Sequence, residues 1–446
     1  MKSSTIKLSD HFTVGSLLKF TFPSIAMMIF TSIYGVVDGF FVSNYVGKTP
    51  FAALNFIMPF LMMLGAVGFM FGTGGCALVA RTMGEGKSRQ ANQIFSFLIY
   101  TSAFVGIAIS VLGFVFLRPV AAALGAEGEM LEYCVIYGRI LLAANPAFIL
   151  QMEFQSFFIA AEKPKLGFIA TVISGVTNMV LDALLVAVIP MGLVGAALAT
   201  ALSQVVGAVM PLIYFSLPNS SLLRLTKANF DGKVLLKTCT NGSSELMTNI
   251  SMSLVGMLYN IQLLKYSGEN GVAAYGVLMY LNFIFLAAYI GYSIGSAPIF
   301  SYHYGAANYD ELKNLLRKSI GILSAFAIGM FVLSEVMALP LSNLFVGYDE
   351  ELLKLTCRGF VIYSFSFLFA GFAIFSSGFF TALNDGLTSA LISFLRTMLF
   401  QTTAVLLLPL LFGIDGIWAA IVVAEALAVA ASALFIVKKR EMYHYL

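Results

Sequence analysis

The sequence predicts an all-α membrane protein of about twelve transmembrane helices, in two six-helix bundles related by a pseudo-twofold axis along the membrane normal. Three observations predict this fold class: the composition, the placement of Lys and Arg, and an internal repeat. Of the 446 residues, 59% are hydrophobic and 11% are charged, whereas soluble proteins carry roughly 25% charged residues. This composition excludes a soluble enzyme, and a net charge of only +3 with scattered basic residues argues against nucleic-acid binding.

Apolar runs long enough to cross the hydrocarbon layer, which takes about 20 residues, follow one another along the chain. In the first half, the expected helices cover 14–45, 51–80, 92–117, 131–161, 165–189 and 193–216. In the second half, they cover 238–264, 271–303, 312–339, 352–382, 387–411 and 415–437. The longest internal polar connection, about 218–237, is therefore expected to be a cytoplasmic linker that joins an N-lobe (1–220) to a C-lobe (221–446).

Lys and Arg are distributed unevenly over the connections between these helices. If both termini face the cytoplasm, about 18 of the 25 Lys and Arg residues fall in cytoplasmic segments and about five in external ones. Cytoplasmic loops of membrane proteins carry such an excess of positive charge. We therefore expect an integral protein of a prokaryotic-type plasma membrane with both termini in the cytoplasm.

The two halves repeat one another at a constant offset of 221 residues. The offset places Gly84 on Gly305 and Pro119 on Pro340, and further matches occur at Glu129 and Glu350, Gly138 and Gly359, and Gly195 and Gly416. Matched glycines and prolines carry the signal, because apolar matches mean little in so apolar a chain. Six helices per half give both copies one orientation, which is typical of secondary transporters with parallel repeats.

Ionisable side chains inside the expected helices are costly and call for a function. Asp38 and Asp182 lie at a similar depth, on the order of 10–12 Å inside the outer helix ends, and Thr200 lies at the same level of the next helix. Asn178 shares a helical face with Asp182. Such a group of oxygen ligands suits a hard cation or a proton. The alternative is that the two acids only hydrogen-bond to the backbone or to neighbouring helices.

Other polar residues have less definite roles. Glu245 occupies, by the offset, the position of Ser24 in the first half, and a role in coupling or in cargo binding is open. Arg139 and Arg396 lie within expected helices, and the sequence does not assign their partners. The four cysteines lack metal-binding spacing and no Walker-type phosphate loop occurs, so we expect neither a bound cofactor nor the use of ATP.

With these features in place, the chain resembles the MATE (multidrug and toxic compound extrusion) family over residues 12–438. The resemblance rests on the stretch DGFFVSNYVG at 38–47, on the loop RTMGEGK at 81–87, and on the spacing of Asn178, Asp182 and Thr200.

In that family, the positions of Asp38, Asn178, Asp182 and Thr200 form a cation site, read as binding Na⁺ or H⁺, and Glu245 matches an acid of the seventh helix. One departure is that residues 363–380 lack the additional acid that some members carry in the tenth helix. Coupling through the first lobe is therefore the better hypothesis.

The resemblance implies a V-shaped pair of bundles, active as a monomer in the lipid membrane, that exports amphipathic, often cationic compounds in exchange for Na⁺ or H⁺. A lipid-linked oligosaccharide or lipid-headgroup flippase is the nearest alternative, although it would need more basic residues than Arg139 and Arg396. A membrane-embedded enzyme is disfavoured because His11, His303 and His444 lie near helix ends, and a channel is disfavoured by the duplicated bundles.

Overall fold

The computed structural model describes residues 6–46, 48–347 and 349–445, so that Gly47 of the DGFFVSNYVG stretch lies outside the described residues. The first half of the chain forms α1 (Val14–Tyr45), α2 (Lys48–Gly84), α3 (Ser88–Ala123), α4 (Gly128–Ala160), α5 (Pro164–Asp182), the π-helical stretch η1 (Ala183–Val188) and α6 (Gly192–Ser216). The second half forms α7 (Gly232–Gly305), α8 (Tyr309–Val346), α9 (Glu350–Ser364), α10 (Phe367–Ala382), α11 (Gly386–Ser393), the π-helical stretch η2 (Phe394–Phe400), α12 (Gln401–Phe412) and α13 (Ile414–Tyr443).

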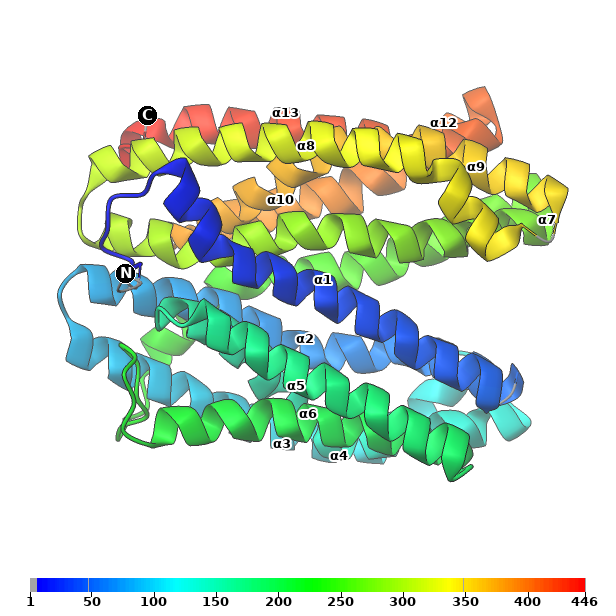
Figure 1. Ribbon diagram of the computed structural model, residues 1–446, viewed down its shortest axis with the longest axis horizontal. Coiled ribbons are helices and arrows are strands. Elements are labelled where there is room, and N and C mark those ends of the chain that lie inside the picture. Colours follow the sequence, from blue (N-terminus) through cyan, green and yellow to red (C-terminus); the bar gives the residue numbers. More distant parts are fainter. Residues whose placement is uncertain (1–5, 47, 348, 446) are drawn as a thin grey trace.

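The longest helix, α7, consists of two helical stretches that meet at a sharp break. Gly268 interrupts it with φ 62° and ψ −151°, a backbone conformation that residues other than glycine rarely adopt. The break falls between the two helices expected over 238–264 and 271–303. α7 therefore contributes the first two helices of the C-lobe, which run in opposite directions (Figure 1).

Among the described residues, ten helices are long and apolar enough to cross a membrane, or eleven when α9 and α10, which are bent by 51°, count as one span. The stretch of α7 before Gly268 does not meet this test. It carries Lys233, Lys237 and Glu245 among many Ser, Thr and Asn residues. Its polar character sets it apart from the other expected spans.

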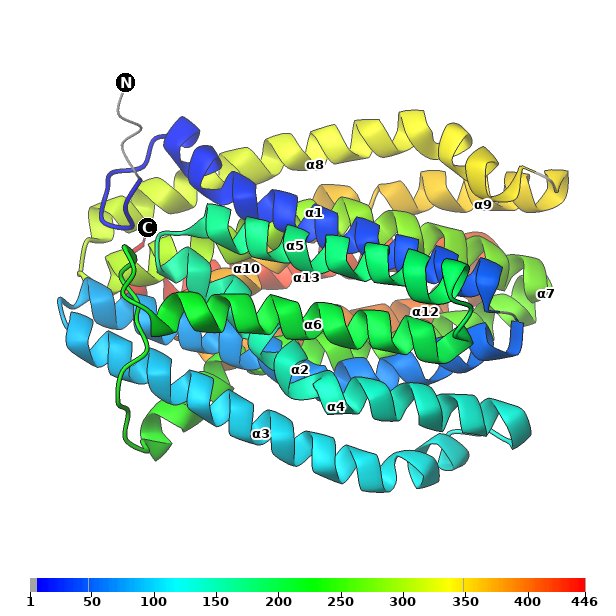
Figure 2. The same ribbon diagram turned by 60° about the horizontal axis from the view of Figure 1, so that its bottom comes forward.

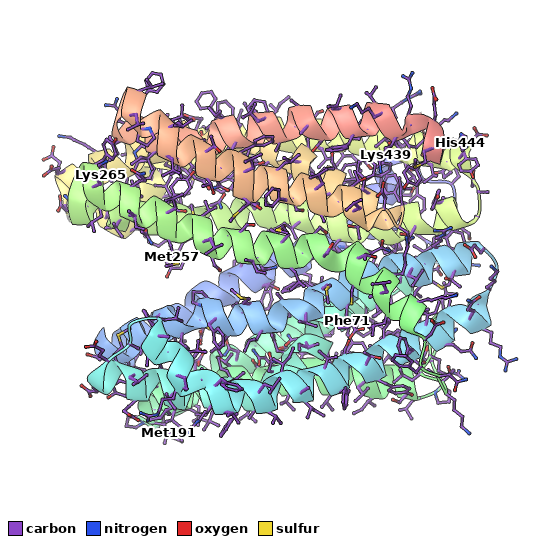
Figure 3. The ribbon with its side chains drawn as sticks, turned by 180° about the vertical axis from the view of Figure 1, so that it is seen from behind. Phe71, Met191, Met257, Lys265, Lys439 and His444 are labelled. Atoms are coloured by element: carbon purple, nitrogen blue, oxygen red, sulfur yellow. The ribbon has the colours of Figure 1, made fainter. Side chains whose placement is uncertain are left out.

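The helices form two lobes that lie side by side (Figures 1 and 2). The N-lobe consists of α1 to α6 and the C-lobe of α7 to α13. Both chain ends lie at one end of the bundle, which we call the termini end (Figure 1). Lys265 and Met191 mark the opposite or far end, away from Lys439 and His444 (Figure 3).

The lobes meet along a seam near the termini end, where α7 packs on α2 and α1 through glycines. A Cβ atom at Gly84 would lie 2.0 Å from the carbonyl oxygen of Tyr302, and one at Gly305 would lie 2.0 Å from the carbonyl oxygen of Arg81. Deeper in the seam, a Cβ at Gly242 would lie 2.0 Å from the carbonyl oxygen of Met70. Backbones in such contact leave no room for a side chain, so the glycines determine how closely the lobes approach.

Replacing Gly84 by leucine is expected to force the seam apart and to destabilise the protein by about 1–3 kcal/mol, the usual effect of overpacking. Gly321→Leu in α8 is the matched control, because nothing lies within 4 Å of a Cβ at that position. The midpoint of thermal unfolding in detergent measures the difference. Equal midpoints for the two variants would show that the seam does not constrain the lobes.

The segment before α1 also ties the two lobes together at the termini end. The backbone N–H of Leu8 donates to Glu162 between α4 and α5 (2.6 Å), whereas that of Phe12 donates to Glu311 of α8 (2.9 Å). His11 Nδ1 lies 2.6 Å from the other Glu311 oxygen. Leu8 and Phe12 are fully buried. Any movement that separates the lobes at this end must therefore release the segment from one of them.

Candidate functional site

The centre of the N-lobe holds a pair of acids, the partly buried Asp38 of α1 and Asp182 at the end of α5. The two carboxyl groups lie close enough to interact electrostatically, and Asp182 is fully buried. Asp38 Oδ1 and both Asp182 oxygens are buried without a hydrogen-bond partner among the described residues. Two neighbouring carboxylates repel each other in a poorly solvated site, so a shared proton or a cation would stabilise the pair.

Local helix geometry positions Asp182. α5 ends at this residue and continues as the π-helical stretch η1. Short π-helical segments within α-helices are frequently found at functional sites. Asn178 lies one turn earlier and is also buried. The α5 residues named by the sequence therefore sit on one helical face, beside α1.

A cavity of about 330 Å³ opens beside the acid pair and is lined by residues of α1, α2, α4, α5 and α6. Asp38, Asn178 and Thr200 line it, whereas Asp182 is not among the lining residues. The structure thus brings all four sequence-predicted residues into one region of the N-lobe. Apolar walls come from residues such as Met58 and Phe148. The cavity combines a few polar groups with a mainly apolar lining, which is typical of small-molecule sites.

α4 also contributes residues to this site that the sequence did not predict. Tyr137 is fully buried, lies beside the Thr200 hydroxyl and is within electrostatic reach of both acids. Asn145 and Gln151, further along the same helix, line the cavity. Gln151 donates to the Ser174 hydroxyl of α5 at 3.1 Å. The spacing from 137 to 145 is two turns of one helical face, and this repeat of polar groups was the available signal.

Glu245 lies away from this cavity, in the C-lobe. It is partly buried on α7, one turn beyond Gly242 of the seam, and has no ion-pair partner among the described residues. Further along α7, Met257 is 63% exposed and faces the N-lobe (Figure 3). Glu245 is therefore an acid without an ion-pair partner among the described residues, close to the seam between the lobes.

The two arginines within the helices face away from the N-lobe cavity. Arg396 of η2 makes a buried ion pair with Glu425 of α13, with Nε 2.9 Å from both carboxylate oxygens. The Arg139 guanidinium lies over the Phe114 ring, 4.8 Å from its centroid. Neither arginine lines the cavity beside Asp38.

The C-lobe ion pair occupies the region that corresponds to the N-lobe acid pair. By the offset of 221, Tyr259 takes the position of Asp38 and Glu425 that of Gln204. The rings of Tyr259 and Tyr275 stack beside it with centroids 4.9 Å apart. In the C-lobe, a protein side chain balances the buried acid, because Arg396 neutralises Glu425. The two lobes share a fold but differ in the charge balance of their centres.

A duplicated bundle of apolar helices with polar groups buried at its centre defines a polytopic membrane transporter. The chain belongs to the MatE family, whose model matches residues 23–184 and 246–405. The ends of the two matches, 184 and 405, are separated by the 221 residues of the repeat.

Curated relatives include the multidrug export protein MepA of Staphylococcus haemolyticus (strain JCSC1435), which is 27% identical over 363 residues and 80% of either chain. MepA of Staphylococcus aureus (strain MSSA476) is 24% identical over 436 residues, which cover 96% of this chain and 94% of the relative. These relatives are export proteins and not enzymes, as the sequence predicted for this chain.

Solved structures of MATE transporters share the fold. One, described as the outward-facing conformation of a multidrug resistance MATE family transporter, superposes with a TM-score of 0.94 at 20% identity and covers all of both chains. A transporter from Pyrococcus furiosus, described as having a binding pocket of reverse polarity, superposes with a TM-score of 0.92 at 20% identity. The predicted fold class and family are confirmed.

Proposed function

We propose that this protein is a secondary active multidrug efflux transporter that couples the entry of Na⁺ or H⁺ to the export of amphipathic, often cationic organic compounds. The observation that carries the proposal is the close pair of Asp38 and Asp182, which has no cationic partner among the described residues. A carboxyl pair of this kind binds a proton or a small cation in the same place. It therefore provides the exchangeable site that an ion-driven transporter needs.

Oxygen groups around the acid pair would complete the ion site. The Asn178 amide and the Thr200 hydroxyl are neutral oxygen donors of the kind that hard cations prefer. The Thr200 and Tyr137 hydroxyls are buried without a hydrogen-bond partner that meets normal geometry. These unpaired groups can turn toward a bound ion, and they fit Na⁺ as well as a proton carried by either acid.

Export would proceed by alternating access of the two lobes. The seam closes the termini end, which we propose to be cytoplasmic in a plasma-membrane protein. The structure then corresponds to a state in which the ion reaches Asp38 and Asp182 from outside while cargo leaves. Because cargo and ion share the N-lobe cavity region, occupancy of the acids alters the walls that cargo contacts. Met58 and Met62 give this cavity an adaptable lining.

Export of ethidium from everted vesicles or proteoliposomes under imposed Na⁺ or H⁺ gradients tests the proposal. Export that follows either gradient and stops when the gradient is collapsed is the expected result. Transport without any dependence on a gradient would contradict it. The flippase alternative predicts instead the movement of a fluorescent phospholipid headgroup, which the absence of arginine in the N-lobe cavity disfavours.

We expect Glu245→Gln to weaken the binding of cationic cargo, because a carboxylate that lies close to the seam without an ion-pair partner among the described residues attracts positive charge. The half-saturating concentration should rise about tenfold for ethidium, equivalent to about 1.4 kcal/mol, and stay unchanged for a neutral dye. Glu351→Gln, on an exposed turn of α9, is the control. An equal loss of gradient dependence for both dyes would instead assign Glu245 to coupling.

A further inference from the structure

A basic pocket of about 520 Å³ lies at the termini end of the N-lobe, between the start of α3 and the linker that follows α6. Its cationic lining residues are Arg89 of α3 and Arg224 and Lys227 of the linker, and no acidic side chain lines it. None of these three cations has an ion-pair partner among the described residues. The neighbouring Lys87, in contrast, pairs with Glu85 at 2.8 Å. The pocket therefore concentrates positive charge that the protein leaves unbalanced.

The linker is fixed against α3 by its own backbone hydrogen bonds. Asn92 accepts from the N–H of Arg224 at 2.6 Å and donates to the carbonyl oxygen of Leu222 at 3.3 Å. Ser96 accepts from the N–H of Thr226 at 2.8 Å. Arg224 is thus held by side chains of α3 opposite Arg89. These hydrogen bonds fix the backbone that carries the cations, so the fold itself defines the pocket.

The first turn of α3 adds to the positive potential. α3 begins at Ser88, and the preceding Lys87 makes no side-chain cap to the free amides of the first turn. A helix of 36 residues presents a partial positive charge and unpaired N–H groups at this end. Arg89 belongs to this first turn and lines the pocket. The positive end of α3 therefore adds to the charge of the side chains, which suits an anionic group with several oxygens, such as a phosphate.

The surroundings of the pocket point to a membrane lipid as the source of that phosphate. The candidate membrane-spanning helix α3 begins at Ser88, beside the pocket. We therefore place the pocket near the lipid headgroups at this end of the span. Large apolar side chains flank it on the same linker and on the start of α7: Leu222 is 44% exposed, Phe230 80% and Leu236 67%. Phe230 also packs on Phe97 of α3, with ring centroids 5.8 Å apart. A soluble inorganic anion would leave these apolar side chains exposed to water, whereas the acyl chains of a lipid would cover them.

We propose that this pocket binds the phosphate headgroup of an anionic membrane lipid, with Arg89, Arg224 and Lys227 as its ligands. Basic pockets at the ends of transmembrane helices bind such headgroups, and each cation near the membrane surface contributes about 1 kcal/mol. A bound lipid bridges α3 and the linker that leads to α7. Lipid occupancy therefore holds the connection between the two lobes against the N-lobe.

Native mass spectrometry of the full-length protein, titrated with phosphatidylglycerol or phosphatidylcholine, tests this site without relying on transport. The pocket variant combines Arg89→Gln, Arg224→Gln and Lys227→Gln. The control combines Lys313→Gln, Arg317→Gln and Lys438→Gln, which remove the same charge from exposed positions outside the pocket at the same end.

For the wild type, the first phosphatidylglycerol is expected to bind at least tenfold more tightly than phosphatidylcholine. The pocket variant should lose this preference, and the control variant should keep it within twofold. An equal loss in both variants would reduce the effect to general surface charge and overturn the proposal. Inorganic phosphate is the third probe: if it displaces phosphatidylglycerol at concentrations near the Kd of the lipid, the pocket is a site for free anions and not for lipid. Circular dichroism and thermal unfolding of both variants verify that they fold.

Discussion

Asp38→Asn and Asp182→Asn are each expected to lower gradient-driven export by at least tenfold, which corresponds to about 1.4 kcal/mol of lost coupling free energy. Each change leaves a single buried carboxylate beside an amide. That amide can satisfy the remaining acid with an N–H group, so the site no longer requires an ion to balance it. The exchange of ion for cargo then loses its driving force.

The measurement compares ethidium export under a gradient with ethidium exchange at equilibrium. The coupling proposal predicts loss of the first and retention of the second, because the cavity walls remain. Asp310→Asn, on the exposed first turn of α8, serves as the control for removal of an acid. If both asparagine variants export against a gradient as the wild type does, the acid pair does not couple transport.

Separating Arg396 from Glu425 is expected to cause the largest loss of stability in the C-lobe. Their side chains are only 13% and 4% exposed, and the guanidinium makes several short contacts with the carboxylate, including Nη2 to Oε1 at 2.7 Å. Glu425→Gln or Arg396→Met leaves one charge buried without its partner, which costs about 3–5 kcal/mol.

The double variant Arg396→Met with Glu425→Leu should recover most of that loss, because an apolar pair of similar size removes both charges together. The exposed pair of Lys354 and Glu350 is the control, since surface ion pairs contribute about 0–1 kcal/mol. Thermal unfolding of the purified variants gives the comparison. If the double variant is as unstable as the single variants, the cluster has a role beyond charge balance.

The architecture could be predicted largely because membrane helices are recorded in the sequence as long apolar runs. Gly268 ended one such run within a few residues of the expected boundary. The bend between α9 and α10 could not be foreseen, because no proline or glycine marks it. There, Ser366 N–H donates to the carbonyl oxygen of Tyr363 at 2.9 Å, closing a turn in place of a helical bond. Tertiary packing produced this bend from residues that also fit a straight helix.

The sequence predicts how far along each helix the candidate site residues lie, but not which faces of the helices turn toward one another. Counting residues from helix ends placed Asp38, Asp182 and Thr200 at one level of the membrane. It did not tell which faces of the helices meet, so Tyr137 of α4 was missed and the partner of Arg396 was not assigned. Both depend on how helices far apart in sequence turn toward each other.

The glycine seam brings equivalent positions of the two halves together. Gly84 and Gly305 are the same position of the repeated half, and each packs against the backbone of the other's helix. A contact in which a position meets its own copy is the mark of an isologous interface between identical subunits. Although the chain is a single polypeptide, its two halves therefore meet here as two identical subunits would.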